Sequence, residues 1–170
     1  MNAPGRQRFW LTNRIVNPIL LPLLRSPLTA RTSRRLAVLR YTGHLSGQTY
    51  ELIVQCARAG HTIWIVPGQH ERKTWWRNFR TPRRVDLWLA GKLLHGQAVV
   101  IDGQADPAEA ARALSAYLSA LPHAGRTLNI DAADGAVTTG QARRAIIVRI
   151  TLDDRRDRST SAPGSCSAPS

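Results

Sequence analysis

The chain has 170 residues, enough for one domain with a hydrophobic core, and its apolar fraction of 43% excludes an intrinsically disordered chain. The net charge of +13 is concentrated in the first half, because residues 1–50 hold eight arginines and no acidic residue. An anionic partner is therefore expected to contact that half, and a nucleic acid, an anionic membrane and a phosphorylated small molecule all fit.

Residues 9–24, FWLTNRIVNPILLPLL, are the most apolar stretch. Arg14, Pro18 and Pro22 interrupt it, so it is too short and too broken to span a bilayer, and it lacks the small-residue cleavage site of a secretory signal. Its apolar residues recur at helical spacing. We therefore expect a basic, apolar helical leader over residues 1–30 that either packs on the domain or lies on a membrane surface.

Strand patterns begin at residue 35. Residues 35–43 have the length and apolar content of a strand, and residues 49–66 are typical of two strands joined at Ala59 and Gly60. Residues 84–101 repeat the hairpin pattern, with Ala90 and Gly91 at the turn. The first strand of this second hairpin alternates apolar and polar side chains, which is typical of a half-buried strand.

The last third of the chain predicts one helix and one strand. Asp106 suits the N-cap of a helix over residues 106–121, and residues 142–150 have the pattern of a final strand. Residues 153–170 have almost no apolar content and predict a disordered tail. Because short strands follow one another through tight turns, we expect antiparallel pairing in a mainly β barrel with flanking helices, over residues 31–152.

Residues 43–47, GHLSG, form a glycine-flanked turn at the end of the first strand. The pattern matches neither G-x-S-x-G nor a Walker loop, so it indicates neither a hydrolase nucleophile nor a nucleotide loop. Two interpretations remain open. The segment is either a plain β-turn, in which glycine supplies a positive φ and Ser46 caps the turn, or a cradle whose backbone N–H groups bind an anion.

Residues 66–79, VPGQHERKTWWRNF, place two adjacent tryptophans among charged side chains. Thr74 suits the N-cap of a short helix, on which Trp75 shares a face with Asn78 while Trp76 turns toward arginines. We therefore expect Trp75 to anchor the helix in the core. Trp76 either covers the end of the barrel or forms, beside guanidinium groups, the wall of a binding site.

Neither a pair of carboxylates nor a nucleophile with an adjacent base stands out, so in an enzyme of this sequence a cofactor carries the chemistry. The histidines are scattered and Cys56 and Cys166 lack a CxxC partner, so the sequence predicts neither a metal site nor a disulfide framework. A tryptophan beside arginines also suits single-stranded nucleic acid. No RNP, KH or helix-turn-helix pattern accompanies it, so nucleic acid is not the expected partner.

The order of these motifs resembles the deazaflavin-dependent nitroreductase family of actinobacteria, which are split β-barrel proteins related to FMN-binding, pyridoxamine-oxidase-like barrels. The resemblance covers about residues 13–103, in which a strand leads to TGHLSG, a hairpin, ERKTWWRNF and another hairpin. It implies an FMN-binding-like split barrel and a reduced deazaflavin coenzyme of the factor-420 type, with FMN as the alternative. It also implies hydride transfer to a quinone, a nitro compound or a similar small-molecule electron acceptor.

The resemblance further implies which residues hold the cofactor. The glycine turn matches the family's G-R-[KR]-[ST]-G except that His44 and Leu45 replace its basic pair, and Tyr50 replaces a later arginine. Arg72 and Lys73 are expected to supply the missing phosphate contacts. The predicted cofactor-binding residues are Gly43, His44, Ser46, Gly47, Tyr50, Val66, Pro67, Gly68, Arg72, Lys73, Trp75, Trp76 and Asn78.

Three functions remain open from the sequence. The first is the deazaflavin-dependent oxidoreductase, and the second, motivated by the missing basic pair, is a barrel that binds flavin, haem or lipid without turnover. The third is a single-strand nucleic-acid binder that uses Trp76 and the arginines. We expect the protein in the cytoplasm, with peripheral contact at the inner face of the cell membrane through residues 9–24. The related barrels often dimerise, which implies a homodimer.

Overall fold

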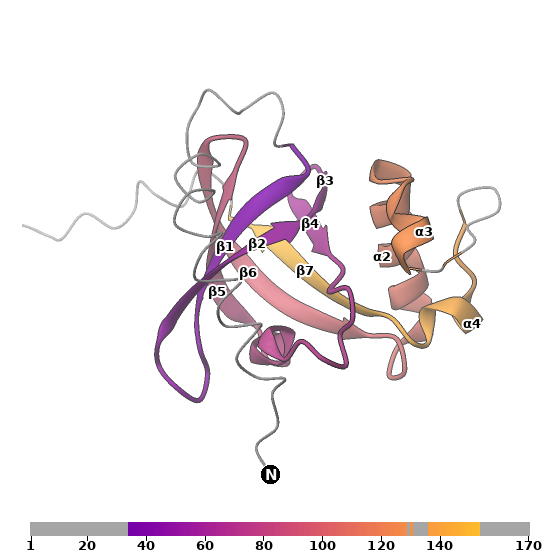
Figure 1. Ribbon diagram of the computed structural model, residues 1–170, viewed down its shortest axis with the longest axis horizontal. Coiled ribbons are helices and arrows are strands. Elements are labelled where there is room, and N and C mark those ends of the chain that lie inside the picture. Colours follow the sequence, from indigo (N-terminus) through magenta and orange to yellow (C-terminus); the bar gives the residue numbers. More distant parts are fainter. Residues whose placement is uncertain (1–33, 129, 131–135, 154–170) are drawn as a thin grey trace, which may run out of the picture.

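The computed structural model describes residues 34–128, 130 and 136–153, which form one curled antiparallel sheet flanked by short helices (Figure 1). The strands are β1 (Leu36–Thr42), β2 (Thr49–Gln55), β3 (Ala57–Ala59), β4 (Thr62–Ile65), β5 (Arg83–Leu89), β6 (Lys92–Asp102) and β7 (Ile146–Leu152). The helices are the 3₁₀ helix η2 (Trp75–Phe79), α2 (Pro107–Ala120), α3 (Ala124–Leu128) and α4 (Thr139–Ala142). The fold is a split β-barrel, which confirms the predicted fold class.

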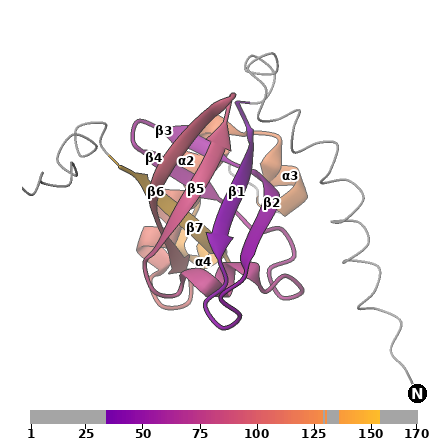
Figure 2. The same cartoon turned by 90° about the vertical axis from the view of Figure 1, so that its left-hand side faces the viewer.

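The strand order across the sheet is β2-β1-β5-β6-β7-β4-β3. The two edge strands, β2 and β3, are consecutive in the chain and separated only by Cys56, whose N–H donates to the Arg35 carbonyl at 2.9 Å. The sheet therefore curls so that its two edge strands adjoin at Cys56. Figures 1 and 2 show the curled sheet from two perpendicular directions. Away from this junction the edges diverge, and a seam opens between β2 and the chain that follows β4.

The two faces of the sheet bury separate apolar clusters. One cluster fills the inside of the barrel and includes Leu39, Leu87 and Val148. The other lies between the outside of the sheet and α2, where Ile147 packs with Leu114. Because successive residues of a strand point to opposite faces, the run of apolar residues in β7 supplies both clusters at once.

The hairpin of β5 and β6 agrees with the sequence pattern. Every second residue of β5 is buried, and the register pairs Leu89 with Lys92 across the turn. Ala90 and Gly91 have positive φ angles of 51° and 72°, as a two-residue type I′ turn requires. The local twist of this turn matches that of the strands it joins.

Residues 49–66 contain three strands rather than the two predicted. The expected turn is present at Gly60, but the first predicted strand divides at Cys56 into β2 and β3. These two strands pair with different partners, β1 and β4, at opposite edges of the sheet. Residues 54–58 contain neither glycine nor proline, so the sequence gives no sign of the change of partner.

The prediction of a strand over residues 142–150 was wrong at its start. Thr138 accepts the Gln141 N–H at 3.3 Å, and the Gln141 side chain accepts the Thr138 N–H at 3.0 Å. This capping box begins α4, so Ala142 is helical and β7 starts only at Ile146. The short loop between α4 and β7 brings Arg144 to a site described below.

The helix predicted over residues 106–121 is α2. The Asp106 carboxylate accepts the Glu109 N–H at 2.8 Å, which confirms the predicted N-cap, and the apolar face of the helix is buried on the sheet. The sequence did not predict α3, which follows α2 directly. The predicted leader over residues 1–30 lies outside the described residues, as does the predicted tail beyond residue 153.

Candidate functional site

A groove of about 810 Å³ follows the open seam of the barrel, and we name it the seam groove. Residues 50–55 of β2 form one wall, and residues 65–68, Lys73 and Trp75 form the wall opposite. Tyr117 of α2 and two residues of α3 complete its lining. The groove thus exists because the chain leaves one sheet edge at Cys56 and continues along the other.

The β2 wall of the seam groove is an unpaired strand edge. Among the described residues, β2 forms its ladder with β1 alone. Alternate backbone N–H and C=O groups of an edge strand point away from its partner. The seam groove therefore offers a row of backbone donors and acceptors to a bound molecule.

Aromatic rings line the end of the seam groove nearest η2. Tyr50 stacks on Tyr41 with ring centroids 5.5 Å apart, and Tyr41 meets Phe79 edge to face at 5.2 Å. Phe79 in turn meets Trp75 at 6.1 Å. Since Tyr50 and Trp75 stand on opposite walls, the groove offers aromatic contact from two sides, which suits a bound ring system.

The two buried tyrosines of the seam groove are neutral. Burial raises the pKa of Tyr41 to about 12, and the neighbouring Tyr50 adds to the shift. Burial likewise raises the pKa of Tyr117 to about 12, with a smaller contribution from Cys56. At neutral pH the inner wall therefore carries phenol groups rather than phenolates, which suits an uncharged ring.

The glycine turn is closed by its own hydrogen bonds. The N–H of Gly43 donates to the Gln48 carbonyl at 2.8 Å, and the N–H of Gly47 donates to the Gly43 carbonyl at 2.9 Å. The N–H of Gln48 donates to the Ser46 hydroxyl at 3.3 Å, and that hydroxyl also lies 3.1 Å from the Tyr50 hydroxyl. Because these N–H groups are already used, the geometry favours a plain β-turn over an anion cradle.

Asn78 joins the glycine turn to η2. Its Oδ1 accepts the His44 N–H at 2.9 Å, and its Nδ2 donates to the Trp75 carbonyl at 2.7 Å. The bond between His44 and Asn78 therefore holds the glycine turn against η2 near the seam groove, and neither residue lines the groove. Leu45, at the tip of the turn, is 93% exposed.

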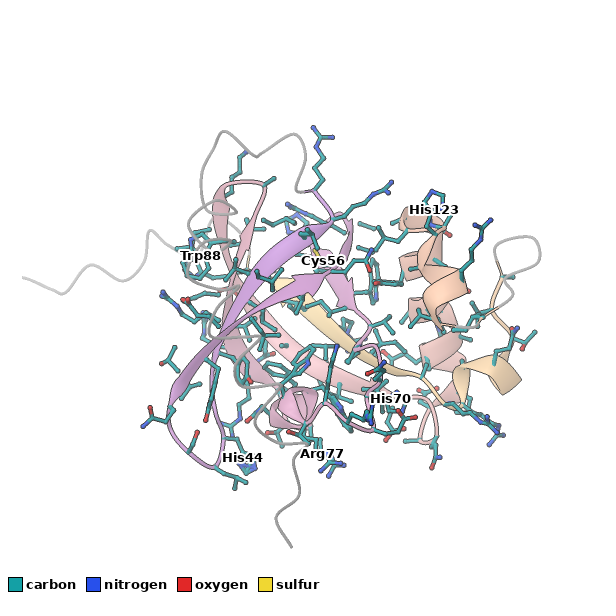
Figure 3. All side chains as sticks on the ribbon, in the orientation of Figure 1. His44, Cys56, His70, Arg77, Trp88 and His123 are labelled. Atoms are coloured by element: carbon teal, nitrogen blue, oxygen red, sulfur yellow. The ribbon has the colours of Figure 1, made fainter. Side chains whose placement is uncertain are left out.

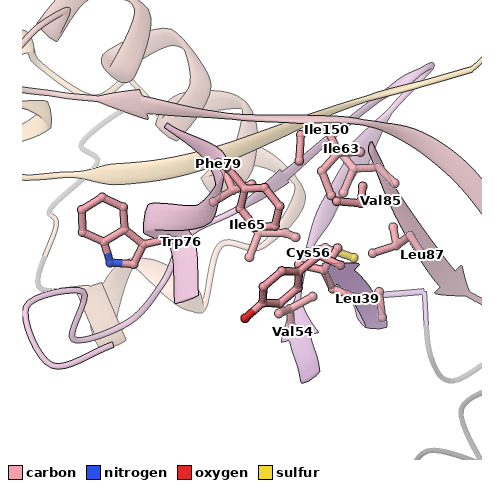
Figure 4. Close-up of a cluster of buried hydrophobic side chains, with 14 of the residues drawn as sticks. Leu39, Val54, Cys56, Ile63, Ile65, Trp76, Phe79, Val85, Leu87 and Ile150 are labelled. Carbon is pink, nitrogen blue, oxygen red and sulfur yellow. The ribbon is translucent and has the colours of Figure 1, made fainter. Parts of the chain in front are cut away.

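Both tryptophans contact the barrel core, and Trp76 rather than Trp75 is the more deeply buried of the two. Trp76 is 6% exposed and belongs to the barrel core with Phe79, as Figure 4 shows. Its Nε1 donates to the His70 carbonyl at 3.0 Å, and the guanidinium of Arg80 lies 5.6 Å from its ring centre. Trp75 is only partly buried and lines the seam groove instead. Thr74 occupies the N-cap of η2, but its side chain makes no capping hydrogen bond.

A second hollow, of about 850 Å³, adjoins the seam groove, and we name it the Arg144 pocket. Residues 66–68 and Lys73 line both hollows, so the two share a wall. The Arg144 pocket adds His70, Arg144 and Glu71, and His70 Nε2 lies 3.6 Å from the Glu71 carboxylate. It is therefore the more cationic of the two neighbouring hollows.

The structure gathers some of the predicted site residues and separates others. Tyr50, Lys73, Trp75 and residues 66–68 line the seam groove, whereas Arg72 is exposed and lines neither hollow. Sequence reasoning missed Arg144, although the basic pair before the last strand was a visible signal. It also missed His70, which lies at the same end of the barrel as His44 (Figure 3).

Cys56 is not a nucleophile at neutral pH. It is 1% exposed, and burial raises the pKa of its thiol to about 12 despite the opposing effect of Arg58. Over the described ranges, no three His, Cys, Asp or Glu side chains are placed to hold a metal ion. No helix within those ranges is long and apolar enough to cross a membrane.

No protein-family model matches the chain, and no curated protein matches its sequence. Among solved structures, Atu2129 from Agrobacterium tumefaciens, of unknown function, is 19% identical with a TM-score of 0.51, over 79% of this chain and 54% of that one. A domain-swapped dimer is 14% identical with a TM-score of 0.51, over 82% and 98%. An FAD and heme binding protein from Mycobacterium smegmatis is 13% identical with a TM-score of 0.42, over 87% and 86%.

At these identities the similarities show the fold alone. The chain spans about half the length of Atu2129. The resemblance to the deazaflavin-dependent family therefore stays a prediction that rests on the order of the sequence motifs.

Proposed function

We propose that the protein binds a deazaflavin coenzyme in the seam groove and transfers a hydride from its reduced form to a quinone, a nitro compound or a similar acceptor. The observation that carries this proposal is the continuity of two unlike hollows. The aromatic seam groove and the cationic Arg144 pocket share Lys73 and residues 66–68. A coenzyme with a flat ring and an anionic tail needs both kinds of surface, side by side.

The seam groove fits the ring. Tyr50 and Trp75 provide aromatic contact from opposite walls, and the edge of β2 that pairs with no other described strand provides backbone groups for the polar rim of the ring. Tyr41 and Tyr117 remain neutral, so burying an uncharged ring against them separates no charge from water. FMN has a ring of similar shape and is the alternative ligand for the same groove.

The Arg144 pocket fits the anionic tail. Lys73 stands where the two hollows join, and Arg144 can offer a planar fork of donors to a phosphate or a carboxylate. These two side chains take the part that the resemblance assigns to the basic pair of the glycine turn, which this chain lacks. The tail would thus pass along residues 66–68 rather than over residues 43–47.

A bound reduced deazaflavin supplies the hydride, so the protein needs neither a nucleophile nor a metal for the transfer. The described residues contribute orientation and exclusion of water. Trp75 and Tyr50 hold a ring between the walls, and the buried side chains of Tyr41 and Val54 keep water from its inner face. The acceptor would approach from the open side of the seam.

The experiment is a titration of the full chain with the oxidised and reduced deazaflavin coenzyme, FMN and haem, followed by absorbance and by tryptophan fluorescence. We expect saturable deazaflavin binding that weakens about tenfold or more in Lys73→Gln/Arg144→Gln, the usual effect of removing a charge-assisted hydrogen bond. Arg83→Gln/Arg112→Gln is the matched control, because it removes two exposed charges that line neither hollow.

The outcomes separate the candidates. Saturable binding with oxidation of the reduced coenzyme by menadione or a nitro compound supports the oxidoreductase. Tight binding without turnover supports the second candidate, a non-catalytic flavin, haem or lipid-binding barrel. The glycine turn favours it because the turn lacks the family's basic pair and the N–H groups of Gly43, His44 and Gly47 are already bonded. No saturable binding of any deazaflavin contradicts the proposal.

We also propose that the protein is a homodimer. One protein of similar fold is a domain-swapped dimer, although that property belongs to that protein. Light scattering after gel filtration should give twice the monomer mass of 18.8 kDa. A cytoplasmic location and peripheral membrane contact through residues 9–24 remain predictions.

A further inference from the structure

A third hollow lies at the far end of the barrel from the glycine turn, and we name it the Arg35 pocket. Its volume is about 740 Å³, and its described lining includes Arg34, Arg35, Arg58 and Lys92. Cys56, which also lines it, stands at the upper end of the barrel in Figure 3, whereas His44 and His70 stand at the lower end. The Arg35 pocket shares no lining residue with the seam groove or the Arg144 pocket, so it is a separate hollow.

The topology brings these cations together from distant parts of the sequence. The β1 strand begins beside the end of β5, where Ala37 pairs with Leu89, and Leu89 pairs with Lys92 across the hairpin turn. The Cys56 N–H donates to the Arg35 carbonyl at 2.9 Å and so ties the start of β3 to the start of β1. Curling of the sheet therefore places three segments and four positive charges around one hollow.

The charged side chains that line the Arg35 pocket are all of one sign in the described part of the chain. Its described lining contains four basic side chains and no carboxylate. Within the described part of the chain, Arg34, Arg35 and Lys92 form no side-chain hydrogen bond or ion pair, and only Arg58 is engaged, through Nε, with the Gly60 carbonyl at 3.0 Å. Elsewhere in the fold Arg40 is paired with Glu51 at 2.7 Å.

Unpaired surface arginines are common in this chain, so a missing partner alone indicates nothing. What distinguishes the Arg35 pocket is that four basic side chains, two of them unpaired arginines, converge on one concave surface. Like charges in a concave site repel one another and create a positive potential that an anion offsets. The carboxyl end of α2 also borders the pocket, and its partial negative charge is smaller than four full positive charges.

The floor of the Arg35 pocket is apolar. Cys56, Ala57, Leu89 and Leu121 each have less than a tenth of their surface exposed and line the hollow beneath the cationic rim. A simple inorganic ion would leave this floor in contact with water. The floor is complementary to a molecule that carries its negative charge on an apolar body.

We propose that the Arg35 pocket binds a phosphate group attached to an apolar body. Guanidinium groups present a planar fork of donors that matches phosphate oxygens, and the apolar floor accepts the attached carbon groups. The phosphate could belong to a soluble phosphate ester or to a phospholipid headgroup. The site is independent of the coenzyme proposed for the seam groove.

Two probes distinguish these sources. Titration calorimetry of the full chain with hexyl phosphate, and with inorganic phosphate for comparison, measures binding of the soluble ester. Sedimentation with phosphatidylcholine vesicles, with and without phosphatidic acid, measures binding to the headgroup. Each measurement is made on the natural chain, on Arg35→Gln/Lys92→Gln, and on Arg83→Gln/Arg112→Gln, which loses the same charge away from the pocket.

We expect hexyl phosphate to bind more tightly than inorganic phosphate. We expect Arg35→Gln/Lys92→Gln to weaken binding about tenfold or more, as loss of a charge-assisted hydrogen bond does, while the control pair changes it little. If Arg35→Gln/Lys92→Gln weakens binding to phosphatidic acid vesicles while hexyl phosphate does not bind, the phospholipid headgroup is the source of the phosphate. The proposal is overturned if neither probe binds, if both pairs of substitutions weaken binding equally, or if inorganic phosphate binds as tightly as hexyl phosphate.

Discussion

Asn78 connects the glycine turn to η2 beside the seam groove. It accepts the His44 N–H and donates to the Trp75 carbonyl, so one amide serves the glycine turn and η2 together. Asn78→Ala removes both bonds, and we expect it to lower the free energy of unfolding by about 1–3 kcal/mol, since each bond is worth about 1 kcal/mol. Urea denaturation measures this loss.

Asn78→Asp is the matched comparison at the same position. The carboxylate keeps an acceptor for the His44 N–H but loses the donor to the Trp75 carbonyl. The His44 amide should therefore stay protected from hydrogen exchange in Asn78→Asp and lose protection in Asn78→Ala. Equal protection in the two variants would show that the bond to His44 does not hold the turn.

The adjacent tryptophans give a sharper test at the residue scale. Trp76 is buried in the barrel core, so we expect Trp76→Ala to cost about 3–5 kcal/mol of unfolding free energy. Trp75 is partly buried and lines the seam groove, so Trp75→Ala should cost less stability and remove more ligand affinity. Urea denaturation and the coenzyme titration measure the two effects, and similar stability losses in both variants would contradict these placements.

At the scale of elements, the sequence predicted correctly those structures that are determined by interactions between residues close in sequence. The hairpin of β5 and β6 and the helix α2 follow from alternation, a turn pair and an N-cap, all of which lie within a few residues. The division at Cys56 escaped prediction because β2 and β3 choose partners that are distant in sequence. The capping box of α4 was visible as Thr138 and Gln141, but the apolar run that followed favoured a strand.

The candidate site was harder to predict than the fold. Of the predicted cofactor-binding residues, Tyr50, Lys73 and Trp75 line one groove, and their role in binding stays a prediction. The sequence did not show that Trp76 would be buried more deeply than Trp75, because the side of η2 that faces the core depends on how the helix packs on the barrel. Arg144 joins the same region only through the pairing of β7 with β4 and β6, which the sequence does not specify.

The β5–β6 turn supports a prediction at this scale. Ala90 has a φ of 51°, which costs a residue with a Cβ about 1 kcal/mol, and asparagine tolerates that region better. Ala90→Asn should therefore stabilise the fold by up to about 1 kcal/mol, measured as a higher urea midpoint with an unchanged slope. Gly91→Ala, at a φ of 72°, should act in the opposite direction, and a gain in stability there would contradict the turn assignment.

At the scale of the whole molecule, the three hollows lie in two regions of the barrel. The open seam holds the aromatic groove and the Arg144 pocket beside it, and the Arg35 pocket lies at the far end, where the sheet edges meet. The positions of the seam groove and of the Arg35 pocket both result from one feature of the chain, its passage from β2 to β3 through Cys56. The strands that form the barrel therefore also determine where these basic side chains gather.

Three buried acids link the stability of the whole barrel to alkaline pH. Tyr41, Cys56 and Tyr117 are each less than a tenth exposed, and their pKa values are raised to about 12 from ordinary values of 10.0, 9.0 and 10.0. In the unfolded chain these groups lose protons first, so the unfolded state binds fewer protons above pH 9. Their contribution is complete below the unfolded pKa values and is lost as the pH rises toward 12.

Urea denaturation at intervals from pH 8 to pH 11 checks this expectation. Above the ordinary pKa of each group, stability should fall by about 1.4 kcal/mol per pH unit for that group. Tyr117→Phe removes one titrating buried phenol and should flatten the fall more than Tyr50→Phe, which removes only the smaller of the two causes that raise the pKa of Tyr41. A free energy of unfolding that stays constant up to pH 11 would show that these groups ionise as readily in the folded barrel as in the unfolded chain.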